Sequence, residues 1–280
     1  MVVTDVDGTL VQPDKSLAPS TAAAAHRLAA AGIPLGIVSA RPTFGLHVLA
    51  QALSLDGLLA GFNGGVVATP DGTAIARRLL SPDAVHAALD LFARRGISAW
   101  LFTETEWLAT DPNGPRIPLE RHTIGVDERI VPSLAAFADQ CGKVVGVCDD
   151  EPLLAATEQE LQALLGTTAN AKRSQTYYLD VTHPEANKGN AVRILAGQLG
   201  IDVADVAVLG DMANDLPMFA VAGFSIAMGN GTAEVQAAAS AVTARNDADG
   251  WAQAIDRYVL GQTGAMKDGA MKASAMKKGA

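Results

Sequence analysis

Short unbroken runs of apolar residues recur along the chain, and polar residues follow each of them. Three such runs begin at Val2, Leu35 and Val206. Because polar residues do not alternate within them, the runs indicate strands that are buried on both faces, as in a parallel sheet. The Ala-rich segment 19–32 and the amphipathic segment 188–200 each end at a glycine and predict helices. The pattern therefore predicts an α/β fold with a Rossmann-like, parallel-sheet core.

Polar residues suited to chemistry stand at the end of each of these runs. The segment 5–9 (Asp-Val-Asp-Gly-Thr) follows the first, Ser39 the second and Asp211 the third. Ligands of open α/β sheets gather at the carboxyl ends of the strands, so we expect these side chains to lie together. Since residues i and i+2 of a strand share a face, Asp5 and Asp7 are placed to flank one phosphorus atom. In isolation the same segment is also typical of a strand followed by an Asp-Gly turn.

Residues 80–182 are too many for a loop and carry a pattern of their own. The segment after Pro115 is expected to be a solvent-facing loop. The region as a whole is expected to form a smaller α/β domain that is inserted into the core, leaving 1–79 and 183–262 as a discontinuous core domain. Such a cap would close over the site, exclude water and contact the leaving group of a substrate. Within it we predict helices at 82–96, 132–140 and 152–165 and strands at 97–103, 106–111, 143–149 and 176–181.

The composition indicates a folded globular protein, because 49% of the 280 residues are hydrophobic and 18% are charged. A net charge of −9 and the lack of a basic stripe argue against nucleic acid as a partner. No apolar run approaches the ~20 residues that span a membrane. Two cysteines, Cys141 and Cys148, are too few for a disulfide framework, and no signal segment precedes the first strand. We therefore expect a cytoplasmic monomer or homodimer.

The C-terminal segment 263–280 differs from the rest of the chain. Ala-Met-Lys recurs every five residues in it, a period that fits neither a helix nor a strand. We interpret it as a low-complexity tail that lies outside the catalytic fold. A basic tail that contacts an acidic partner or a membrane surface is the alternative interpretation.

Four segments of the chain resemble the four motifs of the haloacid dehalogenase-like hydrolase superfamily. They are 5–9, Ser39, Lys188 and 210–215 (Gly-Asp-Met-Ala-Asn-Asp), and they occur in the order of the family. Ser39-Ala40-Arg41 stands where Thr-Gly-Arg is common, and it keeps both the hydroxyl and the arginine. Lys188-Gly189, Asn63-Gly64-Gly65 and Met228-Gly229-Asn230-Gly231 further resemble the Cof-type branch, which carries a large α/β cap between the second and third motifs.

The resemblance implies a phosphatase that acts on a small phosphorylated metabolite. Asp5 would be the nucleophile and form an aspartyl-phosphate, while Asp7 would protonate the leaving oxygen and then deprotonate a water molecule. The available ligands are hard oxygens, which suit Mg²⁺ better than Zn²⁺. Asp5, the main-chain carbonyl of Asp7 and Asp211 would hold the Mg²⁺ ion, with support from Asn214 and Asp215.

The same resemblance suggests which residues contact the phosphoryl group and the substrate. Lys188 would serve catalysis by its charge, and Ser39 by its hydroxyl; Lys188 also lies at a predicted helix start, which favours an anion. For Asn187 and Asn214, a helix N-cap is the alternative interpretation, and for Asn63-Gly64-Gly65 it is a hairpin turn. The predicted substrate-binding residues are Thr9, Ser39, Arg41, Asn63, Gly64 and Asn187.

Other functions of the same motif set remain open from the sequence. A phosphotransferase or phosphomutase would share the Asp5 intermediate but pass the phosphoryl group to a sugar instead of water. A dehalogenase is less consistent with the sequence, because it has no use for Asp7 as an acid. A non-catalytic module that binds phosphorylated metabolites would require the loss of a catalytic residue, and none of the set is missing.

Overall fold

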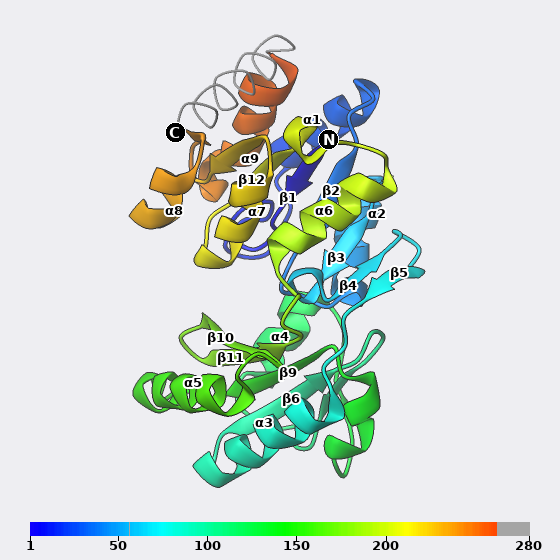
Figure 1. Cartoon of the computed structure of the whole chain (residues 1–280). Helices are drawn as coiled ribbons and strands as arrows, with labels where there is room; N and C mark the ends of the chain where they lie inside the picture. The colour runs from blue at the N-terminus through cyan, green and yellow to red at the C-terminus, as the bar shows by residue number, and fades with distance from the viewer. Residues whose placement is uncertain (56, 262–280) are drawn as a thin grey trace.

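The computed structural model describes residues 1–55 and 57–261 of the chain. It consists of a core built on a mainly parallel sheet and an inserted cap with a mixed sheet of its own, and the two lie end to end (Figure 1). This confirms the predicted α/β fold with an inserted smaller α/β domain. The predicted domain boundaries, between residues 79 and 80 and between residues 182 and 183, remain predictions. The segment predicted as a tail, 263–280, lies outside the described residues.

Within the described residues, the core sheet has eight strands in the order β14-β13-β12-β1-β2-β3-β4-β5. All neighbours from β14 to β3 are parallel, and the last two pairs are antiparallel. Strand β1 lies between β2 and β12, so the three polar strand ends predicted to meet do lie at one edge. The strands are β1 (Val2–Thr4), β2 (Leu35–Val38), β3 (Leu59–Gly61), β4 (Val66–Ala68), β5 (Ala74–Arg77), β12 (Ala207–Gly210), β13 (Phe224–Ala227) and β14 (Ala241–Val242).

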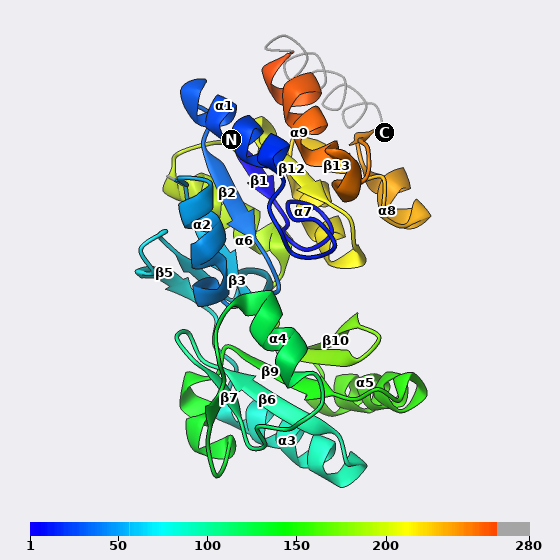
Figure 2. The ribbon, with the colours of Figure 1, turned by 180° about the vertical axis from the view of Figure 1, so that it is seen from behind.

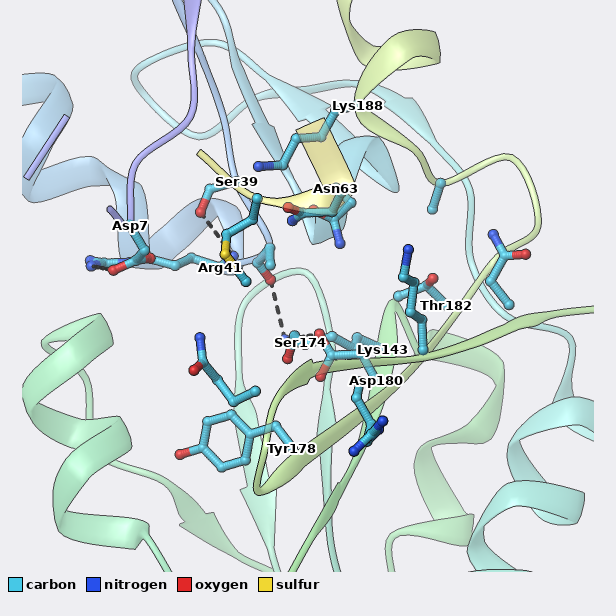
Figure 3. Close-up of a pocket in the computed structure, with 18 of the residues that line it drawn as sticks. Asp7, Ser39, Arg41, Asn63, Lys143, Ser174, Tyr178, Asp180, Thr182 and Lys188 are labelled. Carbon is cyan, nitrogen blue, oxygen red and sulfur yellow. Dashed lines mark hydrogen bonds and ion pairs between the residues drawn. The ribbon is translucent and has the colours of Figure 1, made fainter. Parts of the chain in front are cut away.

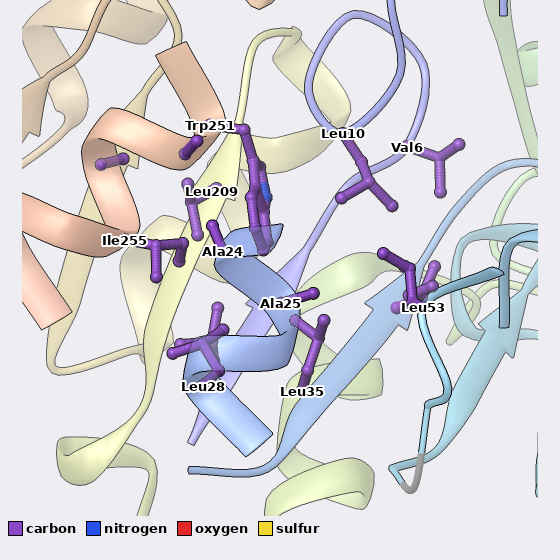
Figure 4. Packing of buried hydrophobic residues seen from close by; sticks show 14 of the residues in the cluster. Val6, Leu10, Ala24, Ala25, Leu28, Leu35, Leu53, Leu209, Trp251 and Ile255 are labelled. Carbon is purple, nitrogen blue, oxygen red and sulfur yellow. The ribbon is translucent and has the colours of Figure 1, made fainter. Parts of the chain in front are cut away.

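Helices cover both faces of the core sheet, which explains why its strands are apolar without alternation. Val2 packs on one face and Val3 on the other, and neither side chain is exposed. One face carries α1 (Pro19–Ala30), α2 (His47–Ala52) and α9 (Gly250–Ala254), which continues as a π-helix over Ile255–Leu260 (Figures 2 and 4). The opposite face carries α6 (Lys188–Gln198), α7 (Leu216–Val221) and α8 (Ala233–Ala238), seen in Figure 1.

The cap sheet, within the described residues, has six strands in the order β10-β11-β9-β6-β7-β8, with only β7 and β8 parallel. Helices α3 (Pro82–Arg95) and α5 (Glu151–Leu165) bury the face of the sheet that points away from the core. The strands are β6 (Ser98–Phe102), β7 (Trp107–Ala109), β8 (Arg129–Ile130), β9 (Lys143–Val147), β10 (Asn170–Gln175) and β11 (Tyr178–Thr182).

Three parts of the cap differ from the sequence-based expectation. The segment after Pro115 is not a loop but forms helix α4 (Ile117–Ile124), which is short and has only a weak helical pattern of apolar positions. Strand β10 has little β-propensity in its sequence Asn-Ala-Lys-Arg-Ser-Gln and pairs with β11 as an edge strand. A 3₁₀ segment, Ala135–Gln140, replaces the helix expected at 132–140.

Two expectations about the chain as a whole can be compared with the structure. In the described part of the chain, neither cysteine forms a disulfide, as expected; Cys141 is buried and Cys148 is half-buried. No helix among the described residues combines the length and the apolar character that crossing a membrane requires.

Candidate active site

The carboxyl ends of the central core strands open into a cavity of about 590 Å³ between core and cap. Asp5, Asp7, Ser39 and Lys188 line its core side, and residues of the cap sheet and α4 line the opposite side (Figure 3). Its volume lies in the range usual for small-molecule sites. The structure thus brings together residues from the four sequence motifs, which are up to 210 positions apart in the chain.

Lys188 lies at the centre of the core side. Its Nζ donates to Oδ1 of Asp5 at 2.6 Å and to Oδ1 of Asp215 at 2.5 Å, and the side chain is 1% exposed. Burial alone would lower the pKa of Lys188, but the charges of Asp215 and Asp5 outweigh it and raise the pKa above its ordinary value. Asn187 caps α6 by accepting from the Asn190 amide at 2.9 Å, which confirms the N-cap interpretation. Lys188 is therefore a fixed ammonium group between two carboxylates.

Three buried carboxylates, those of Asp5, Asp211 and Asp215, form a cluster that fits a metal ion. One oxygen of each lies within 4.8 Å of the others. Burial, followed by the charge of Asp215, raises the pKa of Asp211 to about 6. Burial also raises the pKa of Asp5. The charges of Asp215 and Asp211 add to this rise, and Lys188 opposes it. Such repulsion is what a cation relieves, and an all-oxygen donor set suits Mg²⁺.

The backbone and polar side chains fix the orientation of Asp211 and Asp215. The second oxygen of Asp215 accepts from the amides of Asp211 and Met212 at 2.8 and 2.9 Å. Gly8 has a φ of +84°, and a Cβ atom there would lie 2.2 Å from Oδ2 of Asp211, so only glycine allows this approach. Asn230 donates to the same oxygen at 3.2 Å. The motif Met228-Gly229-Asn230-Gly231 gives Asn230 no role from the sequence alone, and the structure makes it a positioning residue.

Thr9 and Gly64 do not line the cavity, although both were predicted to bind substrate. The hydroxyl of Thr9 is directed at Asp211 and donates to its Oδ1 at 3.2 Å. Gly64 has a φ of +101°, and a Cβ atom there would lie 2.8 Å from that of Ala191 on α6. The structure therefore gives both residues a role in packing and positioning.

Asp7 is held by two cations. Arg41 donates to both of its oxygens, at 2.7 and 2.6 Å, and Lys15 donates at 2.8 Å. Burial by itself would raise the pKa of Asp7, but the hydrogen bonds and charges of Arg41 and Lys15 lower it to about 2. In this conformation Asp7 is ionised, which suits a base; proton donation requires these contacts to loosen. No local pattern in the sequence points to Lys15, which lies in a loop.

The same corner of the cavity joins the core to the cap. Arg41 donates through its second terminal nitrogen to the carbonyl of Thr123 on α4 at 2.6 Å. From the cap, Lys143 Nζ donates to the carbonyl of Ala40 at 3.2 Å. The position of the cap is therefore linked directly to the group that holds Asp7.

Three further predicted residues line the cavity close together. The Ser39 hydroxyl accepts from the Arg41 amide at 3.1 Å, and the Asn63 amide donates to the Ser39 carbonyl at 2.7 Å. Asn63 lies in the 3₁₀ segment Phe62–Gly64, which joins the antiparallel strands β3 and β4, so it is both a turn residue and a cavity residue. Asn214 donates to Asn63 at 3.3 Å; the N-cap interpretation of Asn214 is wrong.

Comparison with known proteins decides the family. The family model described as haloacid dehalogenase-like hydrolase matches residues 2–255. The chain belongs to this family. The match spans both the core and the cap, and it confirms the resemblance inferred from the motifs, including its Cof-type branch.

Curated and solved relatives of this haloacid dehalogenase-like hydrolase agree with the assignment. An HMP-PP phosphatase of Cronobacter sakazakii is 32% identical over 227 residues, which cover 81% of this chain and 82% of the relative. An HMP-PP phosphatase of an Enterobacter strain is 29% identical over 228 residues, with the same coverage of both chains. A crystal structure of a haloacid dehalogenase-like hydrolase from Bacteroides thetaiotaomicron superposes with a TM-score of 0.85 at 27% identity, covering 91% of this chain and 98% of that one. The predicted enzyme class, a phosphoric monoester hydrolase, is confirmed.

The raised pKa values in the carboxylate cluster of this hydrolase predict how its stability depends on pH. Between about pH 4 and pH 6, the folded protein keeps a proton on Asp211 that the unfolded chain has released, and Asp5 acts in the same direction. The free energy of unfolding of the metal-free protein should therefore fall as the pH rises through this range. Asp7, with its pKa of about 2, titrates below it.

A Mg²⁺ ion held by this cluster would bind the deprotonated carboxylates, so a stabilising effect of added Mg²⁺ should grow with pH. Urea unfolding at about pH 5 and about pH 7.5, with and without Mg²⁺, measures this difference. An equal effect of Mg²⁺ at both pH values would show that the cluster does not titrate with the metal.

Proposed function

We propose that this phosphatase is Mg²⁺-dependent and hydrolyses a small phosphorylated metabolite through an aspartyl-phosphate on Asp5. The observation that carries the proposal is the position of Asp5, which lines the cavity, accepts from Lys188 and belongs to the carboxylate cluster. Two relatives named HMP-PP phosphatase support a small phosphorylated substrate.

The chemical difficulty is the approach of one anion to another. Asp5 attacks phosphorus, and the Lys188 ammonium lowers the repulsion between its carboxylate and the phosphoryl oxygens. Asp5, Asp211 and Asp215 would hold Mg²⁺, with the Asp7 carbonyl and Asn214 as further proposed ligands. When bound, the ion neutralises charge on these carboxylates and on the phosphoryl group.

Asp7 carries the proton in both halves of the proposed reaction. It protonates the leaving oxygen in the first half and takes a proton from the attacking water in the second. Arg41 and Lys15 hold its carboxylate on the cavity wall, and loosening of their contacts with it allows the first transfer. Ser39, Asn63 and Asn187 line the same part of the cavity and would contact the phosphoryl oxygens.

Removal of the metal tests this function. With p-nitrophenyl phosphate or a sugar phosphate as substrate, release of inorganic phosphate should fall by at least about 100-fold after chelation and return with added Mg²⁺. The neutralising charge is lost with the ion, while the protein remains intact. Activity that persists after complete chelation would contradict the proposal. Analysis of the products of a sugar phosphate distinguishes hydrolysis from transfer, because a phosphomutase yields an isomerised sugar phosphate.

A further inference from the structure

One face of the cap sheet presents polar side chains to the cavity. On β11, Tyr178, Asp180 and Thr182 share one face, while Leu179 and Val181 pack into the apolar interior of the cap. We call the first group, together with its cross-strand neighbours, the cap strip; it consists of Tyr178, Asp180, Thr182, Lys143 on β9 and Lys172 on β10. Figure 3 shows Tyr178, Asp180, Thr182 and Lys143 of the cap strip facing Ser39, Asn63 and Lys188 across the cavity.

Asp180 is a buried carboxylate in the cap strip. It is 5% exposed, and neither carboxylate oxygen has a hydrogen-bond partner among the described residues. Its nearest cation among the described residues, Lys143 Nζ, lies 3.6 Å away, which is an ion-pair distance, and donates a hydrogen bond to the Ala40 carbonyl at 3.2 Å. The buried Tyr178 hydroxyl also lacks a partner within the described part of the chain. Buried carboxylates in proteins are normally hydrogen-bonded, so Asp180 is free to accept from a donor that a bound substrate supplies.

A second carboxylate faces the same part of the cavity. Glu120 on α4 is 7% exposed and lines the cavity, and burial raises its pKa, with a further contribution from the charge of Asp180. The apolar residues of α4, Ile117 and Ile124, pack in the cluster that contains the aromatic residues of the cap sheet, while Glu120 and Asp180 line the cavity. Two acidic side chains thus line the cavity beside one buried ammonium, that of Lys143, while the other cation of the cap strip, Lys172, is exposed.

We propose that Asp180, with Glu120 beside it, accepts hydrogen bonds from O–H or N–H groups of the leaving group and makes the enzyme select against acidic leaving groups. The inference rests on the proposed phosphatase function. A substrate without donors leaves the buried carboxylates unpaired. A binding site whose buried polar groups stay unpaired strongly disfavours that substrate. A carboxylate at the end of the substrate remote from the phosphoryl group brings no donor to these acceptors, and like charge repels it wherever Asp180 or Glu120 is ionised. The preferred substrate is therefore neutral or cationic at that end.

Glucose 6-phosphate and 6-phosphogluconate form a matched pair of probes, since the second carries a carboxylate at the carbon remote from the phosphate. We expect the wild type to have at least a tenfold higher kcat/KM for glucose 6-phosphate. In Asp180→Asn, kcat/KM for 6-phosphogluconate should rise at least tenfold relative to p-nitrophenyl phosphate. Glu120→Gln should also raise the ratio of kcat/KM for 6-phosphogluconate to kcat/KM for p-nitrophenyl phosphate. A gain of this kind cannot arise from a damaged fold.

Asp90→Asn, an exposed substitution on α3 outside the cavity, is the matched control and should leave the ratios within twofold. Equal use of both sugar phosphates by the wild type would overturn the inference, as would unchanged ratios in both Asp180→Asn and Glu120→Gln. If p-nitrophenyl phosphate is hydrolysed with Mg²⁺ in these experiments, only the inference about the cap strip fails. If no ester is hydrolysed at all, the proposed function fails with it.

Discussion

Replacing Asp5 by Asn should reduce the rate of phosphate release by on the order of 10⁴-fold or more, because an amide cannot form the acyl phosphate. The substitution keeps the shape of the side chain, and Lys188 keeps its contact with Asp215. The loss should therefore appear in kcat, measured as initial rates of phosphate release from p-nitrophenyl phosphate with Mg²⁺ present.

The control for this prediction is Asp90→Asn, which makes the same chemical change at an exposed position on α3. It should retain activity within twofold of the wild type. An Asp5→Asn protein that folds and retains activity within tenfold of the wild type would contradict the assignment of the nucleophile.

Lys188→Met should be the most destabilising of the single substitutions in the site. It removes the cation between Asp5 and Asp215 and leaves two carboxylates buried without their partner. Breaking a buried ion pair in this way lowers the free energy of unfolding by about 3–5 kcal/mol. Turnover should fall by on the order of 10²-fold or more, because a charge that stabilises the phosphoryl oxygens is lost.

Urea unfolding at neutral pH measures the stability of Lys188→Met, and Mg²⁺ should recover part of the loss by supplying another cation to the same carboxylates. Arg193→Met on the same helix removes an exposed cation and should change the free energy of unfolding by less than about 0.5 kcal/mol. If Lys188→Met is as stable as Arg193→Met, the ammonium group does not compensate the buried carboxylates as described.

The core and the position of its site were predictable because they follow from short-range patterns and one topological rule. Strands covered on both faces are apolar throughout, as Val2 and Val3 show. Parallel strands bring their carboxyl ends to one edge, which places Asp5 and Ser39 on one cavity and Asp211 next to Asp5. The helix N-cap that Asn187 forms was equally predictable, since it depends only on the residue three positions further on.

The contacts that the sequence could not predict depend on tertiary structure. Lys15 lies in a loop, and its ion pair with Asp7 has no local signature. Arg41 was predicted to contact substrate, but its contact with the Thr123 carbonyl depends on where α4 lies. The alternation of β11 is visible in the sequence, whereas the absence of a partner for Asp180 depends on the six-stranded sheet around it.

The account makes Asp5 the residue that carries the phosphoryl group, and chemical trapping tests this most directly. Enzyme quenched during turnover with Mg²⁺ and substrate can be reduced with borohydride, which converts an aspartyl-phosphate to homoserine. Mass spectrometry of the peptide 1–15 should then show homoserine at position 5 in the wild type and none in Asp5→Asn. Phosphate release by an enzyme that never yields homoserine at position 5, or trapping at another aspartate, would contradict the central claim.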